Sequence, residues 1–193
     1  MFITINNRQI EVQTGETILQ VCRRENIFIP TFCYHEAFGG QGACRMCMVE
    51  VKENGRNKNR LVAACTYPVT ATIEVFTESD RVQQVRRTLV MLLKRRAAQD
   101  PYIEELAHKY EAPLLPKLKV DPQGCILCRL CILACEKMGK SAIWTVLRGI
   151  DKRIATPYDE ETDECMGCKA CAEICPTQRS EEHTSELQSH HDL

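Results

Sequence analysis

The chain has 193 residues, of which 25 are basic, 26 are acidic and 13 are cysteine, and its net charge is −1 at pH 7. A charge this close to zero argues against a nucleic-acid partner, and no apolar run approaches the length of a membrane span. The length suffices for two or three small modules. Metal is expected to stabilise each module, because none is large enough to bury an extensive core.

Residues 1–78 are predicted to form a small α+β module. Residues 3–12 alternate apolar and polar side chains around Asn6-Asn7, which predicts a hairpin. A short helix is expected from Thr14 to about Arg24. Three further strands are predicted, at 46–51, 61–64 and 72–76. A hairpin, a helix and further strands around a long cysteine loop indicate the β-grasp arrangement.

Four cysteines of this module form the first candidate metal site. Cys44 and Cys47 make a Cys-x2-Cys pair, whereas Cys33 and Cys65 are widely separated from it. This spacing is typical of a 2Fe-2S loop. The glycines within 39–42 would let backbone N–H groups approach the sulfur atoms of the cluster.

Residues 79–118 are predicted to be a helical connector. From Arg81 to Arg96 the apolar period is about 3.6, with six arginines and lysines on one side and an apolar side made of Val82, Val85, Leu89, Leu92 and Leu93. The basic face is expected to be solvated, and a docking surface for an acidic partner is the alternative. A second helix is predicted from Asp100 to Tyr110, and the prolines at 113 and 116 mark a linker.

Residues 119–178 carry one cysteine pattern twice. The spacing Cys-x2-Cys-x2-Cys-x3-Cys begins at Cys125 and again at Cys165, and a hairpin is predicted between the two runs, with strands at 142–147 and 152–155. In bacterial two-cluster ferredoxins the fourth cysteine of such a run binds the other cluster. This rule predicts one 4Fe-4S cluster on Cys125, Cys128, Cys131 and Cys175, and another on Cys165, Cys168, Cys171 and Cys135.

Zinc and disulfide bonds are the alternative explanations of the cysteines. Structural zinc sites prefer two cysteine pairs with a longer spacer, not four cysteines within eleven residues. Secreted disulfide scaffolds are short, and residues 1–4 begin a strand-like alternation instead of a signal peptide. The thiols are therefore expected to be reduced in the cytoplasm. Cys22 lies in an apolar helical segment and is predicted to be a buried structural thiol.

Residues 179–193 resemble the translation of a common short-read sequencing adapter. This segment contains none of the thirteen cysteines. We expect it not to be native, and we expect the natural reading frame to continue beyond Thr177.

Six short segments carry a family resemblance. They are GETIL at 15–19, IPTFCYH at 29–35, GACRMC at 42–47, ACT at 64–66, CILC at 125–128 and CPT at 175–177. With them, residues 1–178 resemble the iron-sulfur (diaphorase or gamma-type) subunit of NAD-linked hydrogenases and formate dehydrogenases. They also resemble the N-terminal region of the complex I large iron-sulfur subunit and of iron-only hydrogenases.

Two positions depart from that family. Its members usually hold another 4Fe-4S cluster between the modules, bound by one histidine and three cysteines, but residues 94–113 contain no cysteine. His108 is therefore predicted to be a surface or packing residue, and three clusters are expected. Arg129 stands where the family often has glycine, and both an altered cluster potential and a neutral substitution remain open.

These features predict an electron-transfer protein that has no catalytic residue of its own. It would carry one 2Fe-2S and two 4Fe-4S clusters, which accept and pass single electrons. The resemblance implies a flavin- and NADH-binding diaphorase subunit and a catalytic redox subunit as partners, with no direct membrane insertion. The alternative is the truncated N-terminal region of a larger oxidoreductase, namely an iron-only hydrogenase, a formate dehydrogenase or a complex I large subunit.

Overall fold

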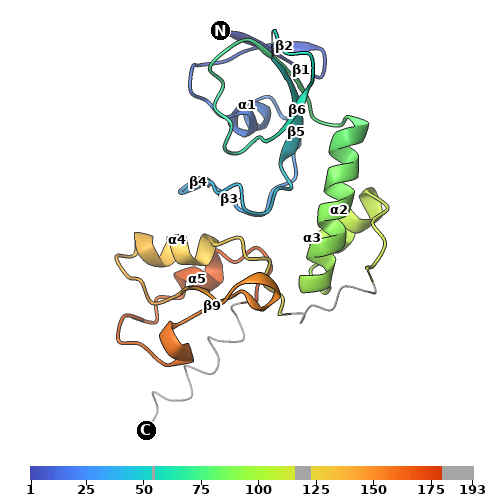
Figure 1. The fold of residues 1–193 in the computed structure, drawn as a ribbon. Helices are drawn as coiled ribbons and strands as arrows, with labels where there is room; N and C mark the ends of the chain where they lie inside the picture. The colour runs from blue at the N-terminus through green and yellow to red at the C-terminus, as the bar shows by residue number, and fades with distance from the viewer. Residues whose placement is uncertain (54, 116–122, 180–193) are drawn as a thin grey trace. The chain divides into compact units, whose positions relative to one another are not determined.

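A computed structural model describes residues 1–53, 55–115 and 123–179 (Figure 1). The chain divides into two compact units, one made of residues 1–92 and 105–113 and the other of residues 93–104 and those from 114 onward. Among the helices in these described ranges, none combines the length and the apolar character that crossing a bilayer requires. Pro116, the predicted boundary at 118/119 and residues 180–193 lie outside the described residues.

The first unit is built on a five-stranded sheet with the order β2-β1-β7-β5-β6. Its strands are β1 (Phe2–Ile5), β2 (Arg8–Glu11), β5 (Met48–Glu53), β6 (Arg60–Ala63) and β7 (Ile73–Phe76). Strand β1 runs parallel to β7, and the other neighbouring pairs are antiparallel. Two shorter strands, β3 (Tyr34–His35) and β4 (Gly39–Gly40), pair separately within the cysteine loop. The three strands predicted after residue 45 are confirmed, each to within two residues.

The predicted N-terminal hairpin is confirmed. Asn6 and Asn7 both have positive φ values, 48° and 66°, which is the backbone of a two-residue type I′ turn. In the resulting register Ile3 lies opposite Ile10, and both side chains are buried. The alternation in the sequence therefore directs one face of the hairpin into the core.

Helix α1 (Ile18–Arg24) packs its buried residues into the core that the sheet provides. It ends where predicted but begins later than Thr14, because a capping box fixes its start. The Gln20 N–H donates to Thr17 Oγ1 (3.3 Å), and the Thr17 N–H donates to Gln20 Oε1 (2.8 Å). This reciprocal pair satisfies two N–H groups that the first helical turn would otherwise leave without partners.

Helices α2 (Asp80–Arg96) and α3 (Pro101–Lys109) confirm the two helices of the predicted connector. Two side chains of α2 do not lie where the sequence pattern placed them. Leu92, assigned to the apolar side, is 42% exposed, and Arg86, assigned to the solvated basic face, is fully buried. The prediction of a wholly solvated basic face is therefore wrong at Arg86, whose guanidinium is held by hydrogen bonds inside the unit.

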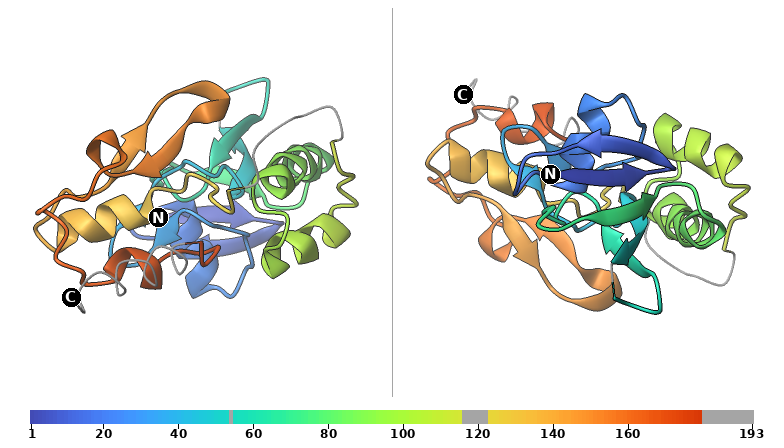
Figure 2. Two further views of the ribbon diagram at one scale, coloured as in Figure 1. Left: turned by 90° about the horizontal axis from the view of Figure 1, so that it is seen from below. Right: turned by 90° about the horizontal axis from the view of Figure 1, so that it is seen from above.

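The second unit contains two short helices and a hairpin. Helices α4 (Leu130–Lys137) and α5 (Ala170–Glu173) pack against each other. The predicted hairpin is confirmed as the antiparallel strands β8 (Trp144–Val146) and β9 (Arg153–Ala155), drawn in orange in Figure 2. Single 3-10 turns at Gly149–Asp151 and Pro157–Asp159 follow the two strands.

Candidate metal centres

Four of the five cysteines of the first unit, Cys33, Cys44, Cys47 and Cys65, come together in its interior. All four side chains are buried. The sulfur of Cys33 accepts hydrogen bonds from the thiols of Cys44 and Cys65, and the thiol of Cys65 also donates to Cys47. The sulfur atoms therefore form a continuous chain, although the sequence separates the first and last of them by more than thirty residues.

Backbone N–H groups of the loop are directed at these sulfur atoms. The Cys44 N–H donates to Cys33 Sγ at 3.3 Å, and the Ala43 N–H donates to the same sulfur. Cys44 receives the N–H groups of Phe32 and Met46, and Cys65 receives that of Gly42. Donors of this kind stabilise anionic sulfur, and the ligands of an iron-sulfur cluster are thiolates. The donor set therefore fits a 2Fe-2S cluster.

The pKa values of the four thiols are shifted in different directions. Hydrogen bonds from the Cys44 and Cys65 thiols lower the pKa of Cys33 to about 2, against the opposing effect of burial. A hydrogen bond from Cys65 similarly lowers the pKa of Cys47 to about 7. The pKa values of Cys44 and Cys65 are raised, because each gives its proton to those bonds and is also desolvated. Binding of a cluster at this site must therefore release the protons that the thiols hold.

Gly40 leaves room for the loop to close. A Cβ atom at this position would lie 2.3 Å from the carbonyl oxygen of Cys65 and 2.5 Å from its Cβ. These distances are far inside van der Waals contact, so only glycine lets strand β4 approach Cys65 this closely. Gly39 and Gly42 are different, since their φ values are positive and a Cβ at either position meets no close contact.

The two cysteine runs of the second unit repeat one backbone path. The residue before the second cysteine of each run has a positive φ, 57° at Leu127 and 65° at Gly167. The residue after it is left-handed too, at Arg129 and Lys169, and helix α4 or α5 begins directly afterwards. Glycine adopts a left-handed conformation at much lower cost than arginine, which gives a physical reason for the glycine that the family often has at the position of Arg129. The Arg129 guanidinium lies 5.9 Å from the centre of the Trp144 ring.

In the second unit Cys175 interacts electrostatically with the first cysteine run. Burial and, to a smaller extent, the neighbouring sulfur atoms of Cys128, Cys125 and Cys175 together raise the pKa of Cys131 to about 12. Burial likewise raises the pKa of Cys171, with smaller contributions from Cys165 and Cys168. Among the described residues, no three Cys, His, Asp or Glu side chains meet as a single metal ion requires. A cluster distributes its thiolates over several irons, so convergence on one point is not needed.

Cys22 and His108 are the two residues predicted to be structural and not ligands. Cys22 is fully buried in α1, as predicted, and burial raises the pKa of its thiol to about 12. His108 lies on the exposed side of α3.

Replacing Cys22 with alanine is expected to leave all three predicted clusters intact. The change removes one small buried side chain and should lower the free energy of unfolding by about 1 kcal/mol. Urea unfolding and the iron content per chain measure the two effects. Loss of iron in Cys22→Ala would show that this cysteine is a ligand.

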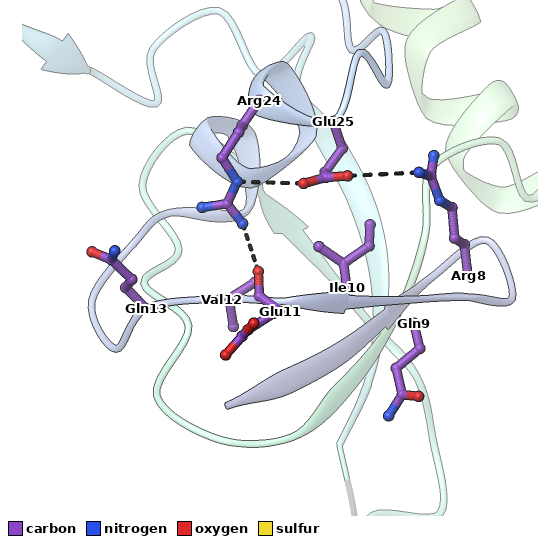
Figure 3. A pocket seen from close by; sticks show the side chains of 8 residues that line it. All are labelled: Arg8, Gln9, Ile10, Glu11, Val12, Gln13, Arg24 and Glu25. Atoms are coloured by element: carbon purple, nitrogen blue, oxygen red, sulfur yellow. Dashed lines mark hydrogen bonds and ion pairs between the residues drawn. The ribbon is translucent and has the colours of Figure 1, made fainter.

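A shallow groove of about 550 Å³ follows strand β2 (Figure 3). Glu25 pairs with Arg24 at 3.4 Å and with Arg8 at 3.7 Å, and Arg24 Nη2 donates to the Glu11 carbonyl at 2.6 Å. These charges satisfy one another, and no cysteine lines the groove. It adds nothing to the metal chemistry.

Comparison with known families places the two cysteine regions in two iron-sulfur domains. Residues 2–80 match the 2Fe-2S iron-sulfur cluster binding domain, and residues 118–181 match the 4Fe-4S dicluster domain. A chain of the NAD+-reducing [NiFe]-hydrogenase, in a crystal structure of its H2-reduced state, superimposes with a TM-score of 0.73 and 26% identity. The match covers 91% of this chain and 84% of that one.

Longer proteins are similar to this chain over part of their length. One subunit of an NADH-quinone oxidoreductase of Rhizobium meliloti is 27% identical over 90% of this chain, and the NADH-ubiquinone oxidoreductase 75 kDa subunit of Reclinomonas americana is 31% identical over 80%. The NADP-reducing hydrogenase subunit HndD of Solidesulfovibrio fructosivorans is 30% identical over 94%. The chain spans only 23%, 25% and 36% of these three relatives, respectively.

Proposed function

We propose that this chain, a homologue of the 75 kDa subunits of NADH-ubiquinone oxidoreductases and of NAD-reducing hydrogenase subunits, transfers single electrons through three iron-sulfur clusters. The observation that carries the proposal is the chain of four buried, hydrogen-bonded thiols in one unit together with the twice-repeated cysteine loop in the other. Its partners would be a flavin-containing, NADH-oxidising subunit and a hydrogenase, formate dehydrogenase or similar redox module.

The proposed architecture is a β-grasp 2Fe-2S domain over 1–78, a helical connector over 79–118 and a two-cluster ferredoxin-like domain over 119–178. The mixed sheet, with β1 parallel to β7 and with α1 packed into its core, supports the first assignment. The repeated left-handed positions and the packing of α4 on α5 support the last. All thirteen cysteines are free thiols, which fits a reducing cytoplasm, where we place the protein, either free or peripheral to a membrane complex.

The proposed ligand sets are those of the sequence prediction. Cys33, Cys44, Cys47 and Cys65 would bind the 2Fe-2S cluster. Cys125, Cys128, Cys131 and Cys175 would bind one 4Fe-4S cluster, and Cys165, Cys168, Cys171 and Cys135 the other. The influence of Cys175 on the pKa of Cys131 supports the crossover between the two runs.

In this function the polypeptide sets the environment of the clusters and makes no covalent bond to substrate. When bound, the clusters supply one-electron chemistry. The Gly42 and Ala43 N–H groups offer hydrogen bonds to ligand sulfur, and burial of the thiols excludes water from the first site. In the second unit Cys165 and Cys168 are exposed, whereas Cys128 is buried. Because exposure is one determinant of cluster potential, the two 4Fe-4S sites should differ in potential.

The reconstituted chain alone is expected to accept electrons from dithionite and not from NADH, because no dinucleotide-binding motif is present in its sequence. Anaerobic visible spectra in the presence of each reductant make the test. Adding a flavin-containing NADH dehydrogenase should then let NADH bleach the cluster absorption. Rapid bleaching by NADH without such a partner would contradict the assignment of hydride chemistry to another subunit.

A second candidate is the N-terminal region of a larger catalytic oxidoreductase. It is favoured by the curated relatives, of which this chain spans about a third or less. Sequencing the source DNA beyond Thr177 separates the two. A stop codon within a few dozen codons supports a separate electron-transfer subunit, and several hundred further codons with new cysteine motifs support the larger enzyme.

A further inference from the structure

A buried arginine lies directly behind the loop that carries Cys44 and Cys47. Arg86 of α2 is 0% exposed, and its guanidinium is bonded on every side. Nε donates to the Met46 carbonyl at 3.2 Å and Nη2 to the Met48 carbonyl at 3.0 Å. Nη1 donates to the Glu78 carboxylate at 2.7 Å and to the Tyr110 hydroxyl at 3.2 Å. Burying a charge is costly unless it is paired and hydrogen-bonded, as this one is.

The Met46 contact brings the guanidinium close to the cysteine loop. Met46 lies between Cys44 and Cys47 in the sequence, and its carbonyl belongs to the same peptide as the Cys47 N–H. A single peptide unit therefore separates the bonded carbonyl from a proposed ligand of the 2Fe-2S cluster.

The buried charge of Arg86 acts on this site. Its ion-pair partner Glu78 is 43% exposed, so water screens that carboxylate while the guanidinium itself is dry. A buried positive charge stabilises a neighbouring group when that group gains an electron. The charge of Arg86 therefore favours reduction at the adjoining site.

We propose that Arg86 is a positioning residue of the 2Fe-2S site, which holds the loop of residues 44–48 and raises the reduction potential of the cluster. The inference rests on the 2Fe-2S assignment of the proposed function. Helix α2 would then help to set the potential of the site. Its sequence pattern, by contrast, indicates only a solvated basic face.

Arg96 of the same helix provides a matched control in the second unit. Its Nε donates to the Cys125 carbonyl and its Nη2 to the Lys152 carbonyl, both at 3.0 Å. Its own carbonyl accepts the Gly124 N–H at 2.9 Å. Arg96 thus contacts a proposed 4Fe-4S ligand loop, and its replacement should affect that cluster and leave the 2Fe-2S cluster unchanged.

Redox titration of the reconstituted full chain, followed by electron paramagnetic resonance of the 2Fe-2S signal, tests the proposal. Arg86→Met is expected to lower the 2Fe-2S potential, and Arg86→Lys to lower it less, because lysine keeps the charge. Glu78→Gln is expected to raise it, because it removes the carboxylate that partly neutralises Arg86. Arg96→Met should leave it at the wild-type value. The opposite signs at Arg86 and Glu78 separate an electrostatic role from simple loosening of the loop, which would shift both variants in one direction.

An unchanged potential in Arg86→Met with full cluster content would overturn the proposal, as would a lowered potential in Glu78→Gln. If Arg86→Met assembles no cluster, Glu78→Gln still tests the proposal. The Glu78 side chain is partly exposed, and the proposal fixes the sign of the shift in potential that its replacement causes. Absence of any 2Fe-2S signal in the wild-type protein is a different result, which would remove the proposed function itself and the inference with it.

Discussion

Cys175→Ser is expected to remove the 4Fe-4S cluster proposed for the Cys125 run and to spare the one proposed for the Cys165 run. The loss should be about four irons per chain. The physical reason is the crossover of the fourth ligand, which the electrostatic effect of Cys175 on the half-buried Cys131 supports. Cys135→Ser is the matched variant, and it should remove the other cluster to the same extent.

Double variants distinguish the two connectivities by iron content alone. If Cys175 and Cys128 bind one cluster, Cys128→Ser combined with Cys175→Ser should lose no more iron than either single change. Cys168→Ser combined with Cys175→Ser should lose about eight irons, because it damages both clusters. Should the first pair lose both clusters and the second pair only one, each run would bind its own fourth cysteine and the crossover would be wrong.

Gly40→Ala is expected to prevent assembly of the 2Fe-2S cluster. The added methyl group would lie 2.3 Å from the Cys65 carbonyl oxygen, which belongs to rigid backbone. The loop must move to relieve the contact, at a cost of roughly 1–3 kcal/mol or more in the free energy of unfolding. Loss of about two irons per chain, with the 4Fe-4S signals retained, is the predicted result.

Gly39→Asn is the control for this change. Gly39 also belongs to β4, but a Cβ there meets nothing within 4 Å, and asparagine tolerates its positive φ better than most residues. The control should keep the 2Fe-2S cluster. Equal iron loss in both variants would mean that the conformation of the loop, and not the contact with Cys65, controls assembly.

The fold was predictable wherever the signal is local. The hairpin at Asn6-Asn7 follows from strict alternation and from the turn preference of asparagine, and the strands that follow have the same period of two. The start of α1 was predicted too early, although the sequence carries its signal. Thr17 and Gln20 have the Thr-x-x-Gln spacing of a capping box.

The burial of Arg86 was not predictable from the period of α2. The pattern places Arg86 on the polar side of the helix. Its environment, however, depends on carbonyls about forty residues earlier in the chain and on Tyr110 after the next helix. Such partners are brought together by tertiary structure. The sequence around an arginine in a basic helix does not indicate that its side chain will be buried.

The candidate metal sites, too, were predictable from the sequence only in part. The spacing of the cysteines is enough to propose ligand sets, because short loops bring neighbouring sulfur atoms close together. The left-handed backbone at Leu127 and Arg129 was not predictable, since neither residue is glycine. The repeat itself offers a partial signal, because the position of Leu127 in the first run corresponds to Gly167 in the second. The fit of Gly40 against Cys65 required the folded chain.

The most direct test of three clusters in this chain is the content of iron and acid-labile sulfide after anaerobic reconstitution, with electron paramagnetic resonance of the reduced protein. Twelve cysteines in three sets of four predict about ten irons and ten sulfides per chain, with one 2Fe-2S and two 4Fe-4S signals. A product that contains only zinc, or a plateau near about six irons, would contradict the account.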